Sequence, residues 1–376
     1  MISNEHKNIL LVHLYSNGDC LYATTVAKQI KNDFPNCKLT WAIADFCQGI
    51  IDNNPCVDEK LVITSVKKDD VVAFRKLKKQ FYQQKKSGIW DEVFITMNMD
   101  ENLALYDGTI RGMVLRAYPN PITVPVQPVL ILTEAEKANA TAFAAEHNLS
   151  SFENVILWEY APQSGQAAFN AAKVLNIAKQ IVELPSTCII LSSLKSFATS
   201  SKIFDASKLS FRENAALTHF CTLLIGSSSG ITWLSTSSAG KFLPMVQLLQ
   251  SNGAFLNAPS VDFARFGLPA DKLIELIDAD AEELLNCVEA IADRGFEKAK
   301  SEYHTSLPLQ FNTTPKIIYN LMCYLHFKAV LRHYRINSRV YGSPSLFKRK
   351  FFKGIFTFPA KLLKNLFTKR ILMVGN

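Results

Sequence analysis

The stretch LVHLYSNGDCLYATTVAKQIKNDFP, residues 11–35, decides the predicted fold. Its apolar beginning, with KNIL just before it, has the continuous hydrophobic character of a parallel strand covered on both faces. The sequence SNG ends this run, and a helix is predicted at 20–33. Ligands bind at the carboxyl ends of the strands in an open parallel sheet. The carboxylate of Asp19 is therefore placed to face a substrate, unless it only caps the following helix.

Strands and helices alternate along most of the chain. In the first half, strands are predicted at 9–15, 39–44, 60–64 and 92–96, and helices at 20–33, 46–53 and 71–86. A helix at 134–147 leads to a boundary near residue 150, and the pattern then begins again, with strands at 154–160, 187–193, 222–226 and 243–249 and helices at 166–183, 212–220 and 230–239. This alternation predicts α/β domains, each with a doubly wound parallel sheet.

Length and composition agree with two such domains. The 376 residues suit two domains of roughly 150 residues and an extension, so we expect domains at 1–150 and 151–314 and a C-terminal region at 315–376. With 48% hydrophobic and 20% charged residues, the chain has material for buried cores. No apolar run approaches the roughly 20 residues that span a bilayer, and the N-terminus is unlike a signal peptide, which predicts a cytoplasmic chain.

Short motifs follow the first strand in a regular order. They are Gly18-Asp19, Phe34-Pro35, Thr40-Trp41 and the sequence NPCVD at 54–58. In order and spacing this series resembles the opening of the heptosyltransferase family, glycosyltransferase family 9. The resemblance implies a GT-B architecture, in which two Rossmann-like doubly wound domains face a cleft. It also implies an inverting, metal-independent glycosyltransferase whose general base is Asp19.

Residues 209–249 resemble the donor-site signature of the same family. Positions that fit its frame are Gly226, Ser229, Gly230, Gly240 and Lys241. Ser228 and Trp233 stand where the family usually has Asp and His. Relatives also place a Lys just after the loop at 161–166, whereas no cation stands at 166–170 here.

Two loops of the second domain are candidates to hold a nucleotide diphosphate. Both lead from a strand into a helix, and the N-terminus of a helix presents unpaired amides that bind anions. Simple helix capping is the alternative for both loops and for Glu213. The candidate donor-binding residues are Glu159, Gln163, Ser164, Gly165, Gln166, Glu213, Ser227, Ser228, Ser229 and Gly230.

The segment 98–118 forms much of the acceptor pocket in the relatives. Arg111 and Arg116 are candidates to bind acceptor phosphates or carboxylates by forked hydrogen bonds, with ordinary surface arginines as the alternative. The candidate acceptor-binding residues are Asn17, Gly18, Tyr106, Arg111 and Arg116.

Cysteines and histidines give no metal motif. The eight cysteines include no C-x-x-C pair and the seven histidines no H-E-x-x-H, so we expect buried thiols, no metal and no cofactor. His13, on the strand that leads to Asp19, is predicted to be a core residue.

The end of the chain is strongly basic. Residues 303–376 contain thirteen Lys or Arg and no Asp or Glu, whereas the rest of the chain has 28 basic and 33 acidic residues. Within 345–374, basic residues alternate with Phe, Leu and Ile at about helical spacing, which is typical of a segment lying in an anionic membrane interface. Such a tail could bind nucleic acid instead, but its apolar density favours lipid. Packing on the body is expected for 315–332.

Together these features predict a glycosyltransferase at the inner face of a bacterial inner membrane. It would move a heptose or hexose from a nucleotide-diphosphate donor to a lipid-linked glycan such as a lipopolysaccharide core, and no nucleic acid partner is expected. A non-catalytic glycan-binding or scaffold protein and a nucleotide-sugar epimerase are the alternatives.

Overall fold

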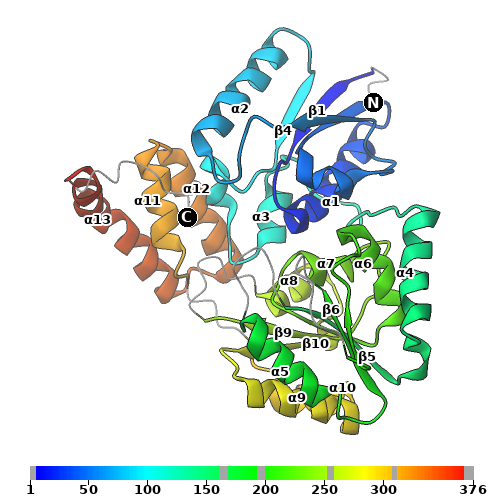
Figure 1. Cartoon of the computed structure of the whole chain (residues 1–376). Coiled ribbons are helices and arrows are strands. Elements are labelled where there is room, and N and C mark those ends of the chain that lie inside the picture. Colours follow the sequence, from blue (N-terminus) through cyan, green and yellow to red (C-terminus); the bar gives the residue numbers. More distant parts are fainter. Residues whose placement is uncertain (1–5, 161–167, 193–199, 252–257, 307–310, 368–376) are drawn as a thin grey trace. The chain divides into compact units, whose positions relative to one another are not determined.

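The computed structural model describes residues 6–160, 168–192, 200–251, 258–306 and 311–367 (Figure 1). The chain forms two compact units. Among the described residues, the first unit contains 6–48, 55–126 and 311–367, and the second unit contains 49–54 and those between 127 and 306.

A parallel sheet of four strands forms the centre of the first unit. Its strands are β1 (Asn8–Val12), β2 (Lys38–Ala44), β3 (Glu59–Ile63) and β4 (Glu92–Ile95), in the order β3-β2-β1-β4. Between them the chain forms α1 (Asn17–Asp33), the 3-10 helix η1 (Asp45–Ile51) and α2 (Val71–Lys86), and after β4 it forms the 3-10 helix η2 (Asp100–Leu105) and α3 (Ile110–Arg116). Strand order reverses between β1 and β4, because the chain runs outward from β1 to β3 and then returns to the other side of β1.

Apolar spacing explains how these elements pack. The side chains from Ile9 to Val12 are fully buried, as expected for a strand covered on both faces. Helix α2 buries Phe74, Leu77 and Phe81, whose spacing places them along one side of the helix, and they join the core below β1.

The second unit is built around a parallel sheet of six strands. These strands are β5 (Asn154–Glu159), β6 (Thr187–Ser192), β7 (Ile203–Asp205), β8 (Leu223–Gly226), β9 (Met245–Leu249) and β10 (Leu273–Ile277), in the order β10-β9-β8-β5-β6-β7. Its helices are α4 (Glu134–Glu146), α5 (Ala171–Ile181), α6 (Phe211–Leu217), α7 (Gly230–Leu234), α8 (Pro259–Phe266), α9 (Ala281–Arg294) and α10 (Phe296–Tyr303), and its 3-10 helices are η3 (Leu149–Ser151), η4 (Thr218–Phe220) and η5 (Ala270–Lys272). Here the strand order reverses between β5 and β8.

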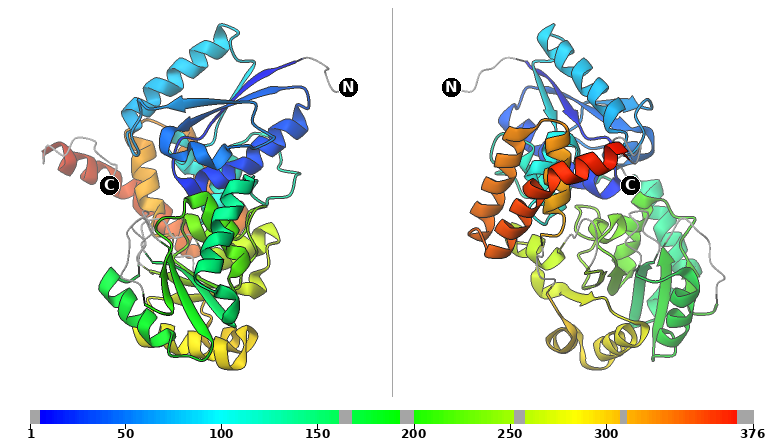
Figure 2. Two further views of the ribbon diagram at one scale, coloured as in Figure 1. Left: turned by 45° about the vertical axis from the view of Figure 1, so that its right-hand side comes forward. Right: turned by 90° about the vertical axis from the view of Figure 1, so that its left-hand side faces the viewer.

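Three C-terminal helices complete the first unit. They are α11 (Thr314–Cys323), α12 (Phe327–Tyr341) and α13 (Ser345–Phe367), which lie together in both views of Figure 2. Helix α13 packs on α11, where the ring centroids of Phe358 and Tyr319 lie 5.7 Å apart. Its buried Phe347 and Phe351 contact the ring of Tyr334 in α12. Helices α11 and α13 approach so closely at Gly354 that an added Cβ would lie 2.9 Å from a methyl carbon of Ile318.

The division of the chain differs from the expected boundaries in two places. The main change of unit falls between residues 126 and 127 rather than near 150, because α4 packs on α6 of the second unit. The C-terminal region, expected as a separate extension, belongs to the first unit as far as residue 367. Among the described helices, none combines the length and the hydropathy needed to cross a membrane.

Candidate active site

Asp19 lies at the point of the first sheet where the strand order reverses. It is the third residue of α1, directly beyond the carboxyl end of β1, while Asn98 follows the neighbouring strand β4. Asn98 Nδ2 donates a hydrogen bond to Asp19 Oδ2 at 2.8 Å. Helix α1 is preceded by Ser16, which makes no side-chain capping bond. Asp19 thus occupies the usual ligand position of such a sheet.

The surroundings of Asp19 raise the pKa of its carboxyl group towards neutral pH. Burial raises its pKa to about 6, while the hydrogen bond from Asn98 and the charge of Lys68 act in the opposite direction. A group with this pKa is mostly ionised at pH 7 and can still accept a proton. It therefore has the pKa expected of a general base.

Three residues that follow β1 or β4, at the same edge of the sheet as Asp19, carry unpaired polar atoms. Within the described part of the chain, Asn17 Oδ1, Asn98 Oδ1 and the hydroxyl of Tyr15 are buried without a hydrogen-bond partner. Burial, followed by the charge of Asp45, raises the pKa of Tyr15 to about 12, so the hydroxyl keeps its proton. Since such groups are costly to bury unpaired, they are available to bind the hydroxyls of a ligand.

An aromatic pair lies on the same edge of the sheet. Tyr15 stacks on Phe46, with 5.6 Å between the ring centroids, and Phe46 remains 60% exposed although it is a large apolar side chain. Asn98, Tyr15 and Phe46 were not among the predicted site residues. The rule that strand ends meet at one edge could have found them, because each follows β1, β2 or β4.

His13 is a core residue. Its Nδ1 lies 2.9 Å from Thr96 Oγ1, and burial lowers its pKa to about 4. The imidazole is therefore neutral at pH 7, in agreement with the role predicted for it.

The predicted acceptor-binding side chains other than Asn17 are engaged inside the first unit. Arg111 is only 1% exposed, and its guanidinium lies 4.4 Å from the ring centre of Tyr22. Arg116 forms an ion pair with the buried Asp107 at 2.6 Å, and Tyr106 is buried. These contacts show what holds both arginines in the first unit, and their forked contacts to an acceptor stay a prediction. Gly18 lies beside Asp19 in the first turn of α1.

Glu159 and the loop after β8 meet at the reversal point of the second sheet. Glu159 Oε2 accepts hydrogen bonds from the backbone amide of Thr232 at 3.3 Å and from its hydroxyl at 3.4 Å. Burial raises the pKa of Glu159, although hydrogen bonds from Ser229 and from the amides of Ile231 and Thr232 oppose the shift. Glu159 therefore holds the start of α7 in place.

The loop itself has a fixed shape. Ser228 has a left-handed backbone, with φ 54°, and its amide donates to Gln247 Oε1 at 2.7 Å. A Cβ at Gly226 would lie 2.3 Å from Thr232 Oγ1, so only glycine fits there. Ser227, Ser228 and Ser229 are all buried. Trp233, at the usual His position, is buried against Phe263.

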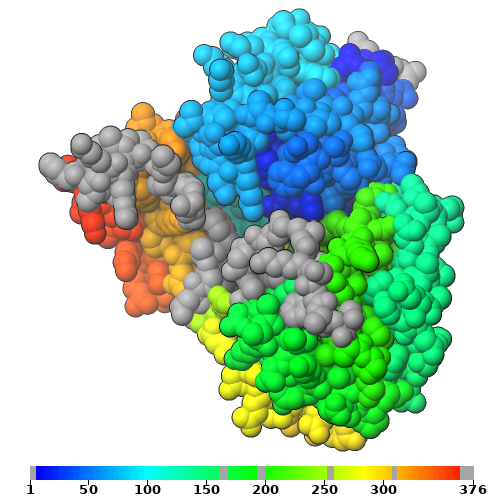
Figure 3. Space-filling model, viewed as in Figure 1, coloured from blue at the N-terminus to red at the C-terminus, as the bar shows by residue number. Residues whose placement is uncertain are grey.

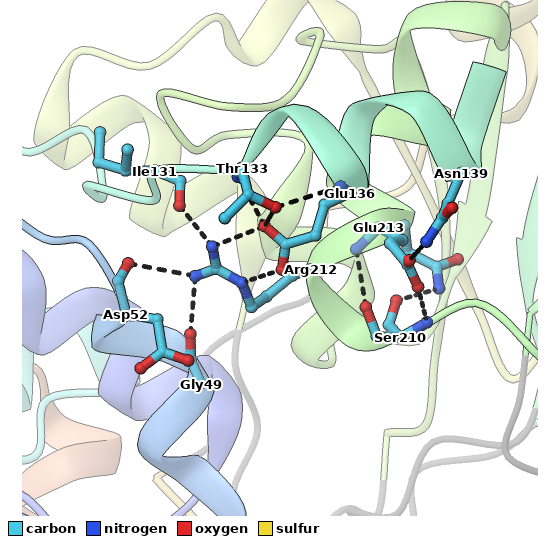
Figure 4. Close-up of polar contacts among 10 residues, drawn as sticks. Gly49, Asp52, Ile131, Thr133, Glu136, Asn139, Ser210, Arg212 and Glu213 are labelled. Atoms are coloured by element: carbon cyan, nitrogen blue, oxygen red, sulfur yellow. Dashed lines mark hydrogen bonds and ion pairs between the residues drawn. The ribbon is translucent and has the colours of Figure 1, made fainter.

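Glu213 takes the alternative role that was left open for it. It forms a capping box with Ser210 at the start of α6 and accepts a hydrogen bond from Asn139 Nδ2 at 2.6 Å (Figure 4). The neighbouring Arg212 bonds both oxygens of Glu136 and the carbonyl oxygens of Gly49 and Ile131. The bond from Arg212 lowers the pKa of Glu136 to about 2. This network fixes α4 to α6.

Four predicted donor-binding residues, Gln163, Ser164, Gly165 and Gln166, lie outside the described residues.

Asp100, Glu101 and His326 bring possible metal ligands together in the first unit. Asp100 is already paired with Lys78 at 3.2 Å and with Arg75. Burial opposes its ionisation, but hydrogen bonds from Arg75 and His326 and the charge of Lys78 keep the pKa of Asp100 well below its usual range. The cluster is balanced by cations and joins η2 to the C-terminal helices.

No protein-family model matches the sequence, and no curated protein matches it. Among solved structures, the crystal structure of a glycosyl transferase family 9 protein from Veillonella parvula aligns with 74% of this chain and 87% of its own, with a TM-score of 0.52 and 16% identity. The chain has a two-domain α/β GT-B fold that is similar to the fold of this structure.

Two further structures are similar to this GT-B chain. ADP-heptose lps heptosyltransferase II from E. coli aligns over 76% of this chain and 98% of its own, with a TM-score of 0.48 and 13% identity. A putative UDP-N-acetylglucosamine 2-epimerase from Listeria monocytogenes aligns over 86% of this chain and 97% of its own, with a TM-score of 0.48 and 11% identity.

Proposed function

We propose that this protein is an inverting, metal-independent glycosyltransferase. It moves a sugar of the heptose or hexose type from a nucleotide-diphosphate donor to a hydroxyl of a lipid-linked bacterial glycan, such as a lipopolysaccharide core. The observation that carries the proposal is the carboxylate of Asp19, which lies at the reversal point of the first sheet with a pKa raised to about 6. The similarity in fold to a family 9 glycosyl transferase supports the assignment to glycosyl transfer.

Asp19 acts as the general base in this proposal. It takes the proton from the acceptor hydroxyl while the hydroxyl oxygen attacks the anomeric carbon of the donor sugar. The bond from that carbon to the diphosphate oxygen breaks, the diphosphate leaves with the electron pair, and the configuration at the anomeric carbon inverts. Assistance of this kind typically contributes about 10²- to 10⁴-fold to the rate.

The second unit binds the donor in this proposal. The loop from Ser227 to Gly230 supplies backbone amides and hydroxyls, with Gln163, Ser164, Gly165 and Gln166 as further donor contacts. Gln247 supports this assignment, since its Oε1 orders the loop and its Nε2 is buried with no partner in the described part of the chain. Fixed neutral donors of this kind stabilise the charge that develops on the leaving diphosphate. The protein works at the inner face of the bacterial inner membrane.

A panel of nucleotide sugars tests the function. We expect one nucleotide-diphosphate sugar to raise the unfolding temperature, and we expect that sugar to be transferred only when a lipid-linked acceptor is present. Release of free nucleotide without an acceptor would instead assign the protein as an epimerase. The absence of any stabilising nucleotide would leave the non-catalytic alternative, to which the substitutions at Ser228 and Trp233 point.

A further inference from the structure

The outward side of α13 combines exposed apolar rings with positive charge. Phe352, Phe356 and Leu363 are 46%, 77% and 54% exposed, although α13 already buries another side against α11. At 100° per residue, these three side chains lie within about 40° of one another around the helix axis. Figure 3 shows α13 in red at the surface, beside the orange atoms of α11 and α12.

This stripe is separate from the packed side of the helix. The buried residues Phe347, Phe351 and Gly354 lie about 120° to 180° from the middle of the stripe around the helix axis, by the same helical rotation. The rings of Phe352 and Phe356 stack on each other, with centroids 6.2 Å apart, so they form one continuous apolar surface. An ordinary surface helix shows the opposite pattern, with apolar residues inward and polar residues outward.

Basic side chains border the stripe. Lys348, Arg349 and Lys353 are exposed and fall on either side of it. Residues 345–367 contain no acidic residue, and no Asp or Glu occurs anywhere from residue 303 to the end of the chain. Such a surface is complementary to a partner that is both apolar and negatively charged. An anionic lipid bilayer has these two properties in the correct arrangement, because its headgroups lie above its hydrocarbon.

We propose that the stripe Phe352, Phe356 and Leu363, with Lys348, Arg349 and Lys353 beside it, docks this protein on an anionic bilayer. The helix lies in the plane of the interface. Its apolar side chains enter the boundary between headgroups and acyl chains, and its basic side chains contact lipid phosphates. The buried side of the helix stays packed on the first unit. This docking surface does not depend on the catalytic role of Asp19.

Vesicle sedimentation with the full chain tests the proposal. The apolar variant replaces Phe352, Phe356 and Leu363 by Ser, and the charge variant replaces Lys348, Arg349 and Lys353 by Gln. A matched control replaces Val72, Tyr82 and Ile89 by Ser; these side chains are also exposed, at 74%, 41% and 52%, and lie in the first unit away from α13. The vesicles contain phosphatidylethanolamine and phosphatidylglycerol, or phosphatidylcholine alone.

The wild-type protein and the control are expected to sediment with the anionic vesicles and not with phosphatidylcholine. The apolar variant should bind the anionic vesicles at least about tenfold more weakly than the wild-type protein. The charge variant should bind roughly a hundredfold more weakly at low salt. Unchanged unfolding temperatures would show that all variants are folded. Equal binding by the apolar variant and the wild type would overturn the proposal. The proposal would also be overturned if the wild-type protein sedimented with neither kind of vesicle but formed a dimer, or bound an oligonucleotide, through the same residues.

Discussion

The buried position of Asp19 disfavours the ionised form of its carboxyl group. Burial raises its pKa from 3.8 to about 6, so part of the free energy of folding is lost when the carboxyl group ionises. In the unfolded chain this group releases its proton near its ordinary pKa. The wild-type protein therefore loses stability as the pH rises from about 4 to about 6, and it does not regain that stability above pH 6.

The variant Asp19→Asn should be more stable than the wild type at pH 7.5, by about 1–3 kcal/mol. The gain should shrink as the pH falls from 6 towards 4, because the wild-type carboxyl group is then protonated. Thermal unfolding of both proteins over this pH range measures the difference. A variant that is less stable at every pH would show that the carboxylate has a structural role.

Asn98 is a positioning residue for this base. Its hydrogen bond to Asp19 favours the ionised form, so Asn98→Ala should raise the pKa of Asp19 further. The acid limb of the profile of kcat/KM against pH, which we expect near pH 6, should then move to higher pH, with more activity lost at pH 6 than at pH 8. Asn120→Ala is a matched control, because Asn120 bonds Asp33 at the surface. An acid limb that stays in place in Asn98→Ala would exclude this role.

At the scale of elements, Arg212 joins α6 to α4 and to the segment 49–54. It is 7% exposed and bonds Glu136, Gly49 and Ile131, with 2.8 Å to the carbonyl oxygen of Gly49. Arg212→Met should lower the free energy of unfolding by about 2–4 kcal/mol, since it leaves buried oxygens without donors.

Lys137→Met is the control for this change. Lys137 also pairs with a glutamate of α4, Glu134, at 2.7 Å, but both side chains are exposed, so the loss should stay below about 0.5 kcal/mol. Urea unfolding of the two variants measures the difference. Equal losses would show that the network around Arg212 contributes no more than a surface ion pair.

The positions of strands and of Asp19 could be predicted because they depend on local sequence. The apolar run that forms β1 is continuous, and the turn after it must lie at the carboxyl edge of the sheet. The environments of Arg111 and Arg116 could not be predicted in this way. Arg116 is neutralised by Asp107 and Arg111 is covered by Tyr22, and such contacts depend on how distant segments pack.

Short or atypical elements were also missed. Strand β7 has only three residues, and β10 carries the charged Glu275 inside an otherwise apolar run, where it bonds Ser260. Both strands are set by the neighbours with which they pair rather than by their own pattern.

At the scale of the whole chain, the positive charge and the first sheet belong to one unit. The basic C-terminal helices pack on the part of this unit that follows β4, through the bond of His326 to Asp100 at 2.7 Å and the bond from Asn337 Nδ2 to the carbonyl oxygen of Tyr106 at 3.0 Å. The tail is therefore part of a core as well as a charged surface.

Deletion of residues 342–376 should lower the unfolding temperature, because it exposes the apolar surface of α11 on which α13 packs. The serine variant of the exposed stripe should leave this temperature unchanged. Calorimetry of both proteins tests the distinction. A deletion without thermal effect would mean that α13 adds nothing to the stability of the first unit.

Transfer by Asp19→Asn tests the central claim most directly. With the donor found by the panel, the variant should lose about 10²- to 10⁴-fold in transfer rate and keep nearly the wild-type affinity for the nucleotide sugar. Asp293→Asn, which changes an exposed carboxylate on α9 of the second unit, should transfer at the wild-type rate. Wild-type transfer by Asp19→Asn, or an equal loss of transfer and of donor affinity, would contradict the assignment of Asp19 as the general base.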